Sequence, residues 1–352
     1  MKRKLTDMCD IQYGYAFDSA CFTTDSTFPP LVRIRDVKRG YSETFFCGKY
    51  PKEYVIHDGA LLIGMDGEFN IGRWCGRDAL LNQRVCKVSA KCGTNEEYLR
   101  FALSKALKEI EGRTSFVTVK HLSAKELNNL ELESPVFNTQ KKISDILVKT
   151  EAIISLCQQE LQKLDELVKA RFVEMFGDPR TNSKGFKAKK GSELFKISNG
   201  KAVPNDKRFE EGIPAYGGNG ISWYTDEILY EQDTIVIGRV GYQSGNVHLA
   251  KGPVWITDNA MYISEFYDDC LNLVFLCEMM KQIDFTRLQD AGDLKKVTQR
   301  PFMEADFILP SSQLQDEFMD FVKQVDKSKA AVQEALDEAQ LLFDSLMQKY
   351  FG

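Results

Sequence analysis

The chain has 352 residues, of which 43% are hydrophobic and 28% charged, enough for two domains that each bury a core. No apolar run approaches the roughly 18 residues of a membrane span, and the charged N-terminus is not followed by the apolar stretch of a secretory signal. We therefore expect a soluble, cytoplasmic protein with no membrane partner. The nine cysteines include no C-x-x-C pair, so we expect free, buried thiols and no metal site.

The net charge of −5 is unusual for a protein that binds nucleic acid, but the charge is unevenly distributed. Residues 1–134 carry 20 basic and 18 acidic side chains, residues 178–309 carry 16 and 19, and residues 310–352 carry 4 and 8. Most of the acidic excess thus lies in the last segment. For nucleic acid we expect modest affinity from this chain alone, with partners supplying further phosphate contacts.

In chain order, the pattern predicts a mixed α/β domain at residues 1–134, a long helix at 135–177, a second α/β domain at 178–309 and a second long helix at 310–352. The two helical segments align without a gap at a shift of 175 residues. Each begins with proline, carries a glutamine five residues later and ends in Phe-Gly. This duplication predicts that one unit, a domain followed by a helix, is present twice.

Apolar residues recur in alternating steps of three and four along both helical segments, which is the pattern of a coiled-coil seam. Arg171 and Lys329 interrupt the seam, and Thr150 does so mildly. By analogy with symmetric dimers, we expect the helices to run antiparallel, to pack seam against seam and to hold the two domains apart. The expected seam residues are Ile143, Leu147, Ile154, Leu161, Leu164, Val168, Phe318, Val322, Val332, Leu336, Phe343 and Leu346.

The two domains also repeat, with changing offsets that loop insertions on a shared scaffold would produce. Ile11–Gly14 matches Ile197–Gly200 at a shift of 186, and the apolar strand Leu61–Gly64 matches Ile235–Gly238 at a shift of 174. Further strand-like stretches are followed by Asn82 and Asn259.

Three segments carry a resemblance to a known family. Gln140–Ile143 and Arg171–Pro179, at the start and end of the first helix, resemble the central conserved region of the specificity subunits of Type I restriction-modification systems. The second helix resembles the distal conserved region of that family more loosely. Ile213–Gly220 is similar to a segment of some of its target recognition domains. The resemblance covers essentially the whole chain.

The resemblance implies both a fold and a function. Two similar target recognition domains of mixed α/β structure would be separated by two long antiparallel helices, and each domain would read one half of a bipartite target on double-stranded DNA. The helices would fix the spacer between the halves and dock two modification (methyltransferase) subunits, which bind S-adenosylmethionine and methylate adenine. Restriction (helicase-nuclease) subunits would complete the complex. The chain itself would bind no cofactor and no metal and would not be an enzyme.

The sequence lacks the motifs that catalysis would need. The glycine-rich Tyr216–Gly220 has neither the preceding strand nor the following helix of a nucleotide-binding loop, so we interpret it as a turn or a DNA-facing loop. The single Pro-Pro lacks the flanking acid or amide and the aromatic residue of an amino-methyltransferase, and no phosphate-binding loop is present. The three histidines do not have metal-ligand spacing.

Base reading uses Arg and Lys on guanine and Asn and Gln on adenine, while basic side chains bind phosphates. We expect Arg33–Arg39 to form a strand with a basic face and Arg73–Trp74 to be an exposed basic and aromatic pair. Lys189 and Lys190 are expected to touch phosphates. The candidate DNA-binding residues are Arg33, Arg35, Lys38, Arg39, Arg73, Trp74, Arg77, Lys189, Lys190, Tyr216, Asn219, Trp223, Arg239, Lys295, Gln299 and Arg300.

Two other functions remain open from the sequence. The chain is alternatively a stand-alone two-domain DNA-binding regulator or a decoy specificity protein, which would need no docking surface on its helices. It is alternatively a scaffold whose domains bind protein, since neither domain is strongly basic. The half-site sequences and the spacer length depend on loop geometry and DNA shape that one sequence does not give.

Overall fold

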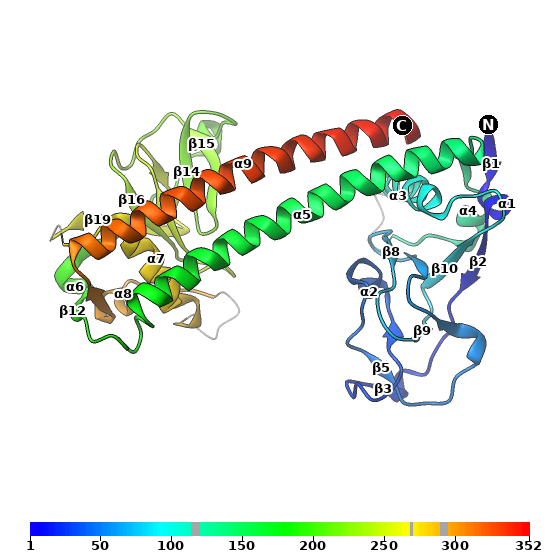
Figure 1. The fold of residues 1–352 in the computed structure, drawn as a ribbon, viewed down its shortest axis with the longest axis horizontal. Helices are drawn as coiled ribbons and strands as arrows, with labels where there is room; N and C mark the ends of the chain where they lie inside the picture. Colours follow the sequence, from blue (N-terminus) through cyan, green and yellow to red (C-terminus); the bar gives the residue numbers. More distant parts are fainter. Residues whose placement is uncertain (114–119, 268–269, 289–294) are drawn as a thin grey trace. The chain divides into compact units, whose positions relative to one another are not determined.

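The computed structural model describes residues 1–113, 120–267, 270–288 and 295–352 (Figure 1). These residues form two compact units. The first unit comprises residues 1–157 and 335–352, and the second comprises residues 158–334. The long helices α5 (Phe137–Phe176) and α9 (Ser312–Phe351) each contribute residues to both units. None of the helices in these described ranges is long and apolar enough to cross a membrane.

The first unit contains many short strands and few helices. Its elements, besides parts of α5 and α9, are β1 (Lys2–Lys4), α1 (Leu5–Met8), β2 (Cys9–Tyr13), η1 (Ser19–Cys21), β3 (Phe22–Thr23), β4 (Leu31–Val32), α2 (Ile34–Arg39), β5 (Phe45–Phe46), η2 (Lys52–Tyr54), β6 (Val55–Ile56), β7 (Leu61–Gly64), β8 (Ile71–Arg73), β9 (Ala79–Leu81), β10 (Val85–Ala90), α3 (Glu96–Arg113), α4 (Ala124–Asn129) and β11 (Glu131–Glu133).

The main sheet of the first unit is antiparallel, with strand order β2-β10-β7-β8. All four residues of β7 are buried, as an apolar run in an inner strand requires. A smaller sheet has the order β4-β9-β6, in which β4 and β9 are parallel. Short pairs β1-β11 and β3-β5 complete the unit.

The second unit repeats this architecture. Its elements are β12 (Lys187–Lys190), α6 (Gly191–Leu194), β13 (Phe195–Asn199), η3 (Asn205–Lys207), β14 (Ile213–Gly217), β15 (Gly220–Thr225), β16 (Thr234–Gly238), β17 (Val247–Ala250), β18 (Trp255–Ile256), β19 (Ala260–Phe266), α7 (Leu273–Ile283), η4 (Phe285–Leu288), α8 (Arg300–Glu304) and β20 (Asp306–Leu309).

Strand order shows the repeat directly. The main sheet of the second unit has the order β13-β19-β16-β17, and its smaller sheet contains the parallel pair β14 and β18. The register agrees as well, because Val85 lies opposite Gly64 in the first unit and Ala260 lies opposite Gly238 in the second. The predicted duplication of a mixed α/β domain is therefore present in three dimensions. The copies diverge after the first parallel strand, where β4 leads into helix α2 but β14 turns back as the β14-β15 hairpin.

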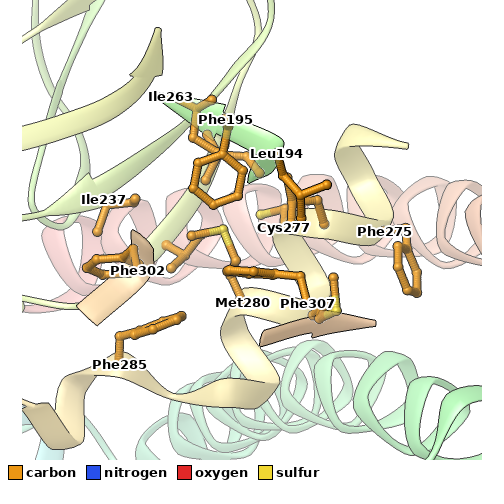
Figure 2. Packing of buried hydrophobic residues seen from close by; sticks show 14 of the residues in the cluster. Leu194, Phe195, Ile237, Ile263, Phe275, Cys277, Met280, Phe285, Phe302 and Phe307 are labelled. Atoms are coloured by element: carbon orange, nitrogen blue, oxygen red, sulfur yellow. The ribbon is translucent and has the colours of Figure 1, made fainter. Parts of the chain in front are cut away.

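Aromatic side chains dominate the core of the second unit. The sheet residues Phe195, Ile237 and Ile263 pack with side chains of α7, η4, α8 and β20 (Figure 2). The C-terminal part of α5 joins this core through Phe172, whose ring lies 5.6 Å from that of Phe275 and 5.5 Å from that of Phe318 on α9. Burying several large rings in one place anchors both long helices to this unit.

The core of the first unit is more aliphatic. Leu61 and Ile63 of β7 pack with Leu99 and Leu103 of α3, and the N-terminal part of α5 joins this cluster through Leu147 and Ile143. The C-terminal part of α9 packs on the same cluster, where Phe343 lies 6.0 Å from Phe101 and Phe351 lies 5.2 Å from Tyr98, measured between ring centroids.

The long helices follow the predicted seam. Every predicted seam residue is buried or half-buried, whereas most of the positions between them are exposed. Within the second unit the helices run antiparallel, because Phe172 of α5 contacts Phe318 of α9 and, further along, Asp165 of α5 accepts from Lys329 of α9 at 2.6 Å. Lys329 interrupts the apolar pattern, and this ion pair explains how the seam accommodates it.

The repeated glutamines have the same function in both copies. Gln140 is 1% exposed, and its side chain accepts from the N–H of Asn95 at 2.9 Å and donates to the carbonyl of Pro135 at 2.8 Å. Gln315 is 2% exposed and bonds in the same way to Asn272 at 2.8 Å and Pro310 at 3.1 Å. Each glutamine thus ties the start of a long helix to the start of α3 or α7, which explains why it recurs at the same offset.

Two predictions about local structure are wrong. Arg33–Arg39 is not a strand, because α2 occupies Ile34–Arg39 and ends at Gly40, which has a positive φ of 76°. Buried Asp36 fixes the helix start, since its carboxylate accepts from the N–H of Arg33 at 2.8 Å. The cysteines are also not uniformly buried, because three of them are exposed. These three are Cys47, Cys75 and Cys92.

Candidate nucleic-acid interface

A cleft of about 390 Å³, lined mostly by residues of polar type, lies in the first unit where three loops meet: the β4-α2 junction, the loop after β7 and the loop between β9 and β10. We call it the first cleft. Its lining residues are Arg33, Ile34, Arg35, Glu68, Asn70, Asn82, Gln83 and Arg84.

A second cleft of about 550 Å³ lies in the second unit, between the β14-β15 hairpin, the loop after β16 and the loop between β18 and β19. We call it the second cleft. It is lined by Val203, Arg208, Gly217, Gly218, Asn219, Ser222, Trp223, Val240, Gly241, Tyr242, Gln243, Thr257, Asp258 and Asn259.

The two clefts occupy the same place in the repeated fold. The N–H of Met65 donates to the carbonyl of Arg84 at 2.9 Å, and the N–H of Arg239 donates to that of Asn259 at 2.9 Å, so Arg84 and Asn259 are equivalent. The same register makes Asn82 equivalent to Thr257. A cleft that recurs at one position of a duplicated fold is a stronger candidate than a cavity found in one copy. The first unit has a larger cavity of about 800 Å³, but it is lined by the β6 and β9 region and residues 48–52.

Asn82 and Thr257 form the floors of the clefts. They are 6% and 7% exposed, and Asn82 Oδ1 and Thr257 Oγ1 have no hydrogen-bond partner among the residues that the structure describes. The backbone of each floor residue lies in close contact with a glycine. A Cβ at Gly14 would lie 2.0 Å from the carbonyl oxygen of Asn82, and one at Gly200 would lie 2.1 Å from that of Thr257. Gly14 and Gly200, which the internal repeat aligns, are therefore required, because a larger residue would clash with these carbonyl oxygens.

The rim of the first cleft is rich in arginine. Arg33 is exposed at the start of α2, and Arg35 donates to Thr44 Oγ1 at 3.1 Å. Arg84 adopts a positive φ of 69° and lies 3.4 Å from Asp66, whose carboxylate also contacts His121. Arginine forks placed around an open cleft suit guanine edges and phosphates.

The rim of the second cleft is rich in amides and aromatic rings. Asn219 is exposed on the β14-β15 turn. The guanidinium carbon of Arg208 lies 5.0 Å from the ring centroid of Trp223. Tyr242 is 79% exposed, and Lys295 lies 4.8 Å from its ring. Exposed amides suit adenine edges, and exposed aromatic rings suit packing against the thymine methyl group in the major groove.

One histidine lies close to the β14-β15 turn of the second cleft. Burial lowers the pKa of His248 on β17, which lies next to Gly220 of that turn.

The structure brings together only some of the predicted DNA-binding residues. Arg33 and Arg35 line the first cleft, and Asn219 and Trp223 line the second. Other predicted residues lie at the edges of the clefts. Lys38 pairs with the rim residue Glu68 at 3.4 Å, Lys295 contacts the ring of Tyr242, and Arg239 directly follows β16.

Arg73 and Trp74 do not form the exposed pair that the sequence suggested. Arg73 on β8 is held by Glu96 at 2.8 Å and Glu97 at 2.6 Å, both at the start of α3. Trp74 is 2% exposed and its indole N–H donates to the carbonyl of Arg77. The side chain of Arg77 donates in turn to two backbone carbonyls, at residues 26 and 28. All three side chains stabilise the first unit itself.

The remaining candidates lie outside the clefts. Arg39 ends α2 beside Glu43, Tyr216 is half-buried on β14, and Gln299 donates to Asn199 at 3.4 Å. Arg300 pairs with Glu304 on α8 at 2.7 Å and is 80% exposed at its side chain. Lys189 and Lys190 lie on β12, where Lys190 pairs with Asp306 at 2.8 Å.

The sequence interpretation missed the β9-β10 loop and its counterpart. Asn82, Gln83 and Arg84 belong to the first cleft, and Thr257 and Asp258 belong to the second. Asn82 and Asn259 were aligned by residue type, but the register pairs Asn82 with Thr257. The position of these residues in a short segment between two apolar strands could have identified them, because such turns carry binding residues on many scaffolds.

The glycine-rich segment contains the end of strand β14 and the β14-β15 turn, so the turn was predicted correctly but a strand precedes it where the sequence suggested none; a strand, not a helix, follows it. Over the described ranges, no three His, Cys, Asp or Glu side chains gather as a metal site would require.

The comparisons with known proteins agree with this repeat. The chain matches the model of the Type I restriction modification DNA specificity domain at residues 1–166 and again at 183–339. Because these two matches cover most of the chain, it belongs to that family.

Individual proteins resemble this chain over only part of its length or at low sequence identity. The specificity subunit of the EcoBI Type I restriction enzyme of Escherichia coli is 35% identical over 170 residues, which is 48% of this chain and 36% of that protein. The match thus spans little more than a third of the curated relative. The crystal structure of an S subunit of a Type I restriction-modification system from M. genitalium has a TM-score of 0.65 at 18% identity, covering 100% of this chain and 96% of the other. A structure concerning assembly of a Type I system has a TM-score of 0.52 at 15% identity, with 100% and 97% covered. These two likenesses support the fold.

Proposed function

We propose that this chain is the DNA-specificity subunit of a Type I restriction-modification complex, in which each unit reads one half of a bipartite target. The observation that carries the proposal is the pair of equivalent clefts with different linings. Each cleft is lined by three amide side chains, but the first adds three arginines and no aromatic ring, whereas the second adds one arginine together with Trp223 and Tyr242. That arrangement suits two different base sequences read by two similar domains.

The long helices supply the second part of the proposal, which is the docking of methyltransferase and restriction subunits. Apolar side chains remain exposed on the first-unit portion of α5: Ile146 is 44% exposed, Ile153 is 49% and Leu156 is 62%. Their spacing of seven and three residues places them on one stripe of the helix. An exposed apolar stripe on a helix whose other face is buried suits binding to a partner protein.

In this function the chain is not an enzyme and works inside the cell. It positions partner subunits on DNA, and S-adenosylmethionine is bound by the modification subunits. The stand-alone regulator or decoy is the second candidate, and the exposed stripe on α5 argues against it.

The proposal is tested by co-expressing the chain with a modification subunit encoded beside it and mapping N6-methyladenine by single-molecule sequencing. We expect methylation at one split motif with a fixed unread spacer. Replacing Ile153 and Leu156 by glutamate should abolish methylation and the complex, while DNA binding by the chain persists. A stable complex that methylates no motif would contradict the proposal that this chain directs methylation.

The length of the helices is tested separately. Deleting one heptad from both α5 and α9 shortens the seam by about 10 Å. We expect the spacer of the methylated motif to change while both half-sites stay the same. An unchanged motif would show that the helices do not set the spacer.

A further inference from the structure

We propose that Asn82 and Thr257 are specificity-determining residues, each reading one base through a side-chain atom at the floor of its cleft. The inference rests on the proposed function, since it assumes that both units contact DNA. It assigns base reading to two positions that are equivalent in the repeat and that lie beneath the clefts.

The first support is a buried polar atom without a partner among the described residues at the same position of both copies. A buried polar atom without a partner destabilises a fold, and buried polar groups normally find partners. Asn82 Oδ1 and Thr257 Oγ1 both lack one in the described part of the chain. They occupy the same register position in two copies whose side chains otherwise differ. A ligand group that enters the cleft and bonds to the floor accounts for both.

The second support is rigidity. The backbone of each floor residue is held against a glycine, Gly14 or Gly200, and sits between strands of the domain core. A side chain on such a backbone is held in position more firmly than one on a flexible loop. Fixed polar groups discriminate well, because a mismatched partner leaves them unsatisfied.

The chemistry of the floor atoms limits what they read. Asn82 offers an amide, which pairs with the N6-amino and N7 groups of adenine, and its free Oδ1 accepts from an amino group. Thr257 offers a hydroxyl, which both donates and accepts, and a methyl group that can pack against thymine. We therefore assign an adenine contact to Asn82 and one hydrogen-bonded base contact to Thr257.

Access to the floors requires movement of the rim. Both floor atoms are closed to solvent, so an occupant reaches them only when rim side chains turn outward. Gln83 and Arg84 are long and exposed beside Asn82, and Tyr242 is 79% exposed at the second cleft. Such side chains change rotamer at modest cost, and DNA phosphates would attract the basic ones.

The test uses Thr257→Val and Asn82→Leu, which keep side-chain volume but remove the polar atoms. The chain, wild type or variant, is co-purified with its modification subunit and selects its motif from a library of random DNA duplexes, and thermal unfolding of the chain is measured in parallel. We expect each variant to relax one base position in one half-site and to weaken binding to the wild-type motif by about 5- to 150-fold. Stability should stay equal or rise, because an unsatisfied buried group is lost.

Matched controls separate base reading from structure. Thr234→Val removes a buried hydroxyl that donates to the carbonyl of Ile263 at 2.6 Å, so it should lower stability and leave the motif unchanged. Asn128→Leu removes the acceptor for Tyr13 outside the first cleft and should behave in the same way.

Each outcome bears on one of the two proposals. If wild type selects a split motif and both floor variants select the same motif at full affinity, the floors hold structural water and the inference is wrong. If wild type itself selects no split motif, the proposed function fails.

Discussion

The clefts show most clearly what the two units of this chain share and where they differ. Both have the same four-stranded sheet, the same parallel pair beside it and a glycine against the floor residue. They differ after the first parallel strand, where one copy forms the helix α2 and the other forms a hairpin. The two copies share the register of the main sheet because packing in the core fixes it. The segments that follow the first parallel strand differ because connecting segments on a common scaffold tolerate change.

The cores of the two units differ in a second way. The second unit holds the helices through a large cluster of phenylalanine rings, whereas the first unit holds them mainly through aliphatic residues, with the buried rings of Tyr98 and Phe101 against α9. Phe318 and Ile143 occupy the same position in the helical repeat, at a shift of 175 residues. The units should therefore differ in how strongly they hold α5 and α9.

The largest expected effect tests whether the two units hold α5 and α9 with different strength. Phe318→Ala removes a fully buried ring in contact with Phe172, Phe176 and Phe275, and should cost about 3–5 kcal/mol of unfolding free energy. Ile143→Ala removes a smaller side chain that is 7% exposed and should cost less, about 2 kcal/mol. Urea unfolding of both variants measures the difference. Equal costs would show that the aromatic cluster adds nothing beyond ordinary packing.

The next effect tests the shared scaffold. Gly14→Ala and Gly200→Ala force a methyl group to about 2 Å from a carbonyl oxygen, so both should destabilise by about 3 kcal/mol. Gly112→Ala is the control, because it lies in α3 with open space around it and should be neutral or stabilising by up to about 1 kcal/mol. Thermal unfolding gives all three values. A large cost at one of the cleft glycines and none at the other would break the equivalence of the floors.

A further effect concerns the unequal rims. Arg33→Ala should relax a guanine position in one half-site, and Asn219→Ala should relax an adenine position in the other, each by about 1–3 kcal/mol. Arg39→Ala, at the end of the helix α2 that Arg33 precedes, and Asn205→Ala, in the second unit, lie outside the clefts and serve as controls. Motif selection from random DNA measures all four. Relaxation of the same half-site by both rim variants would contradict one half-site per unit.

The smallest effect is a pH dependence confined to the first unit. Burial alone would raise the pKa of Glu97, but hydrogen bonds from Arg100 and Arg73 outweigh it and hold the pKa below its usual value. The resulting stability is present above the unfolded pKa of about 4.3 and is lost as the pH falls through the lower folded pKa. The stability advantage of wild type over Glu97→Gln should therefore shrink between about pH 5 and pH 3. Thermal unfolding across that range measures it, and a constant difference would show that the ionised carboxylate adds nothing.

Much of the fold could be predicted from periodic patterns. The heptad spacing gave both long helices and their buried faces, and the gap-free repeat gave the duplication, because both depend on residues near one another in sequence. The strand Leu61–Gly64 was predictable as a continuous apolar run. Arg33–Arg39 was misassigned because its alternating charges resemble a strand, while the helix depends on Asp36 at its start and Gly40 at its end.

The candidate site was only partly predictable. Arg33 and Asn219 were found because arginine and asparagine near a turn are ordinary base readers. Arg73 was misleading because two glutamates more than 20 residues later neutralise it. The floor residues were missed because burial without a partner is a property of the folded chain and leaves no mark on local sequence.

Residue identity and spacing were sufficient to predict the family, the duplication and the two long helices. Which loops meet above the sheet depends on the folded chain, because three segments distant in sequence converge there through strand pairing. The tertiary structure also decided that Asn82 corresponds to Thr257, since that equivalence follows from hydrogen-bonded register and the two residues share no chemistry that an alignment would detect.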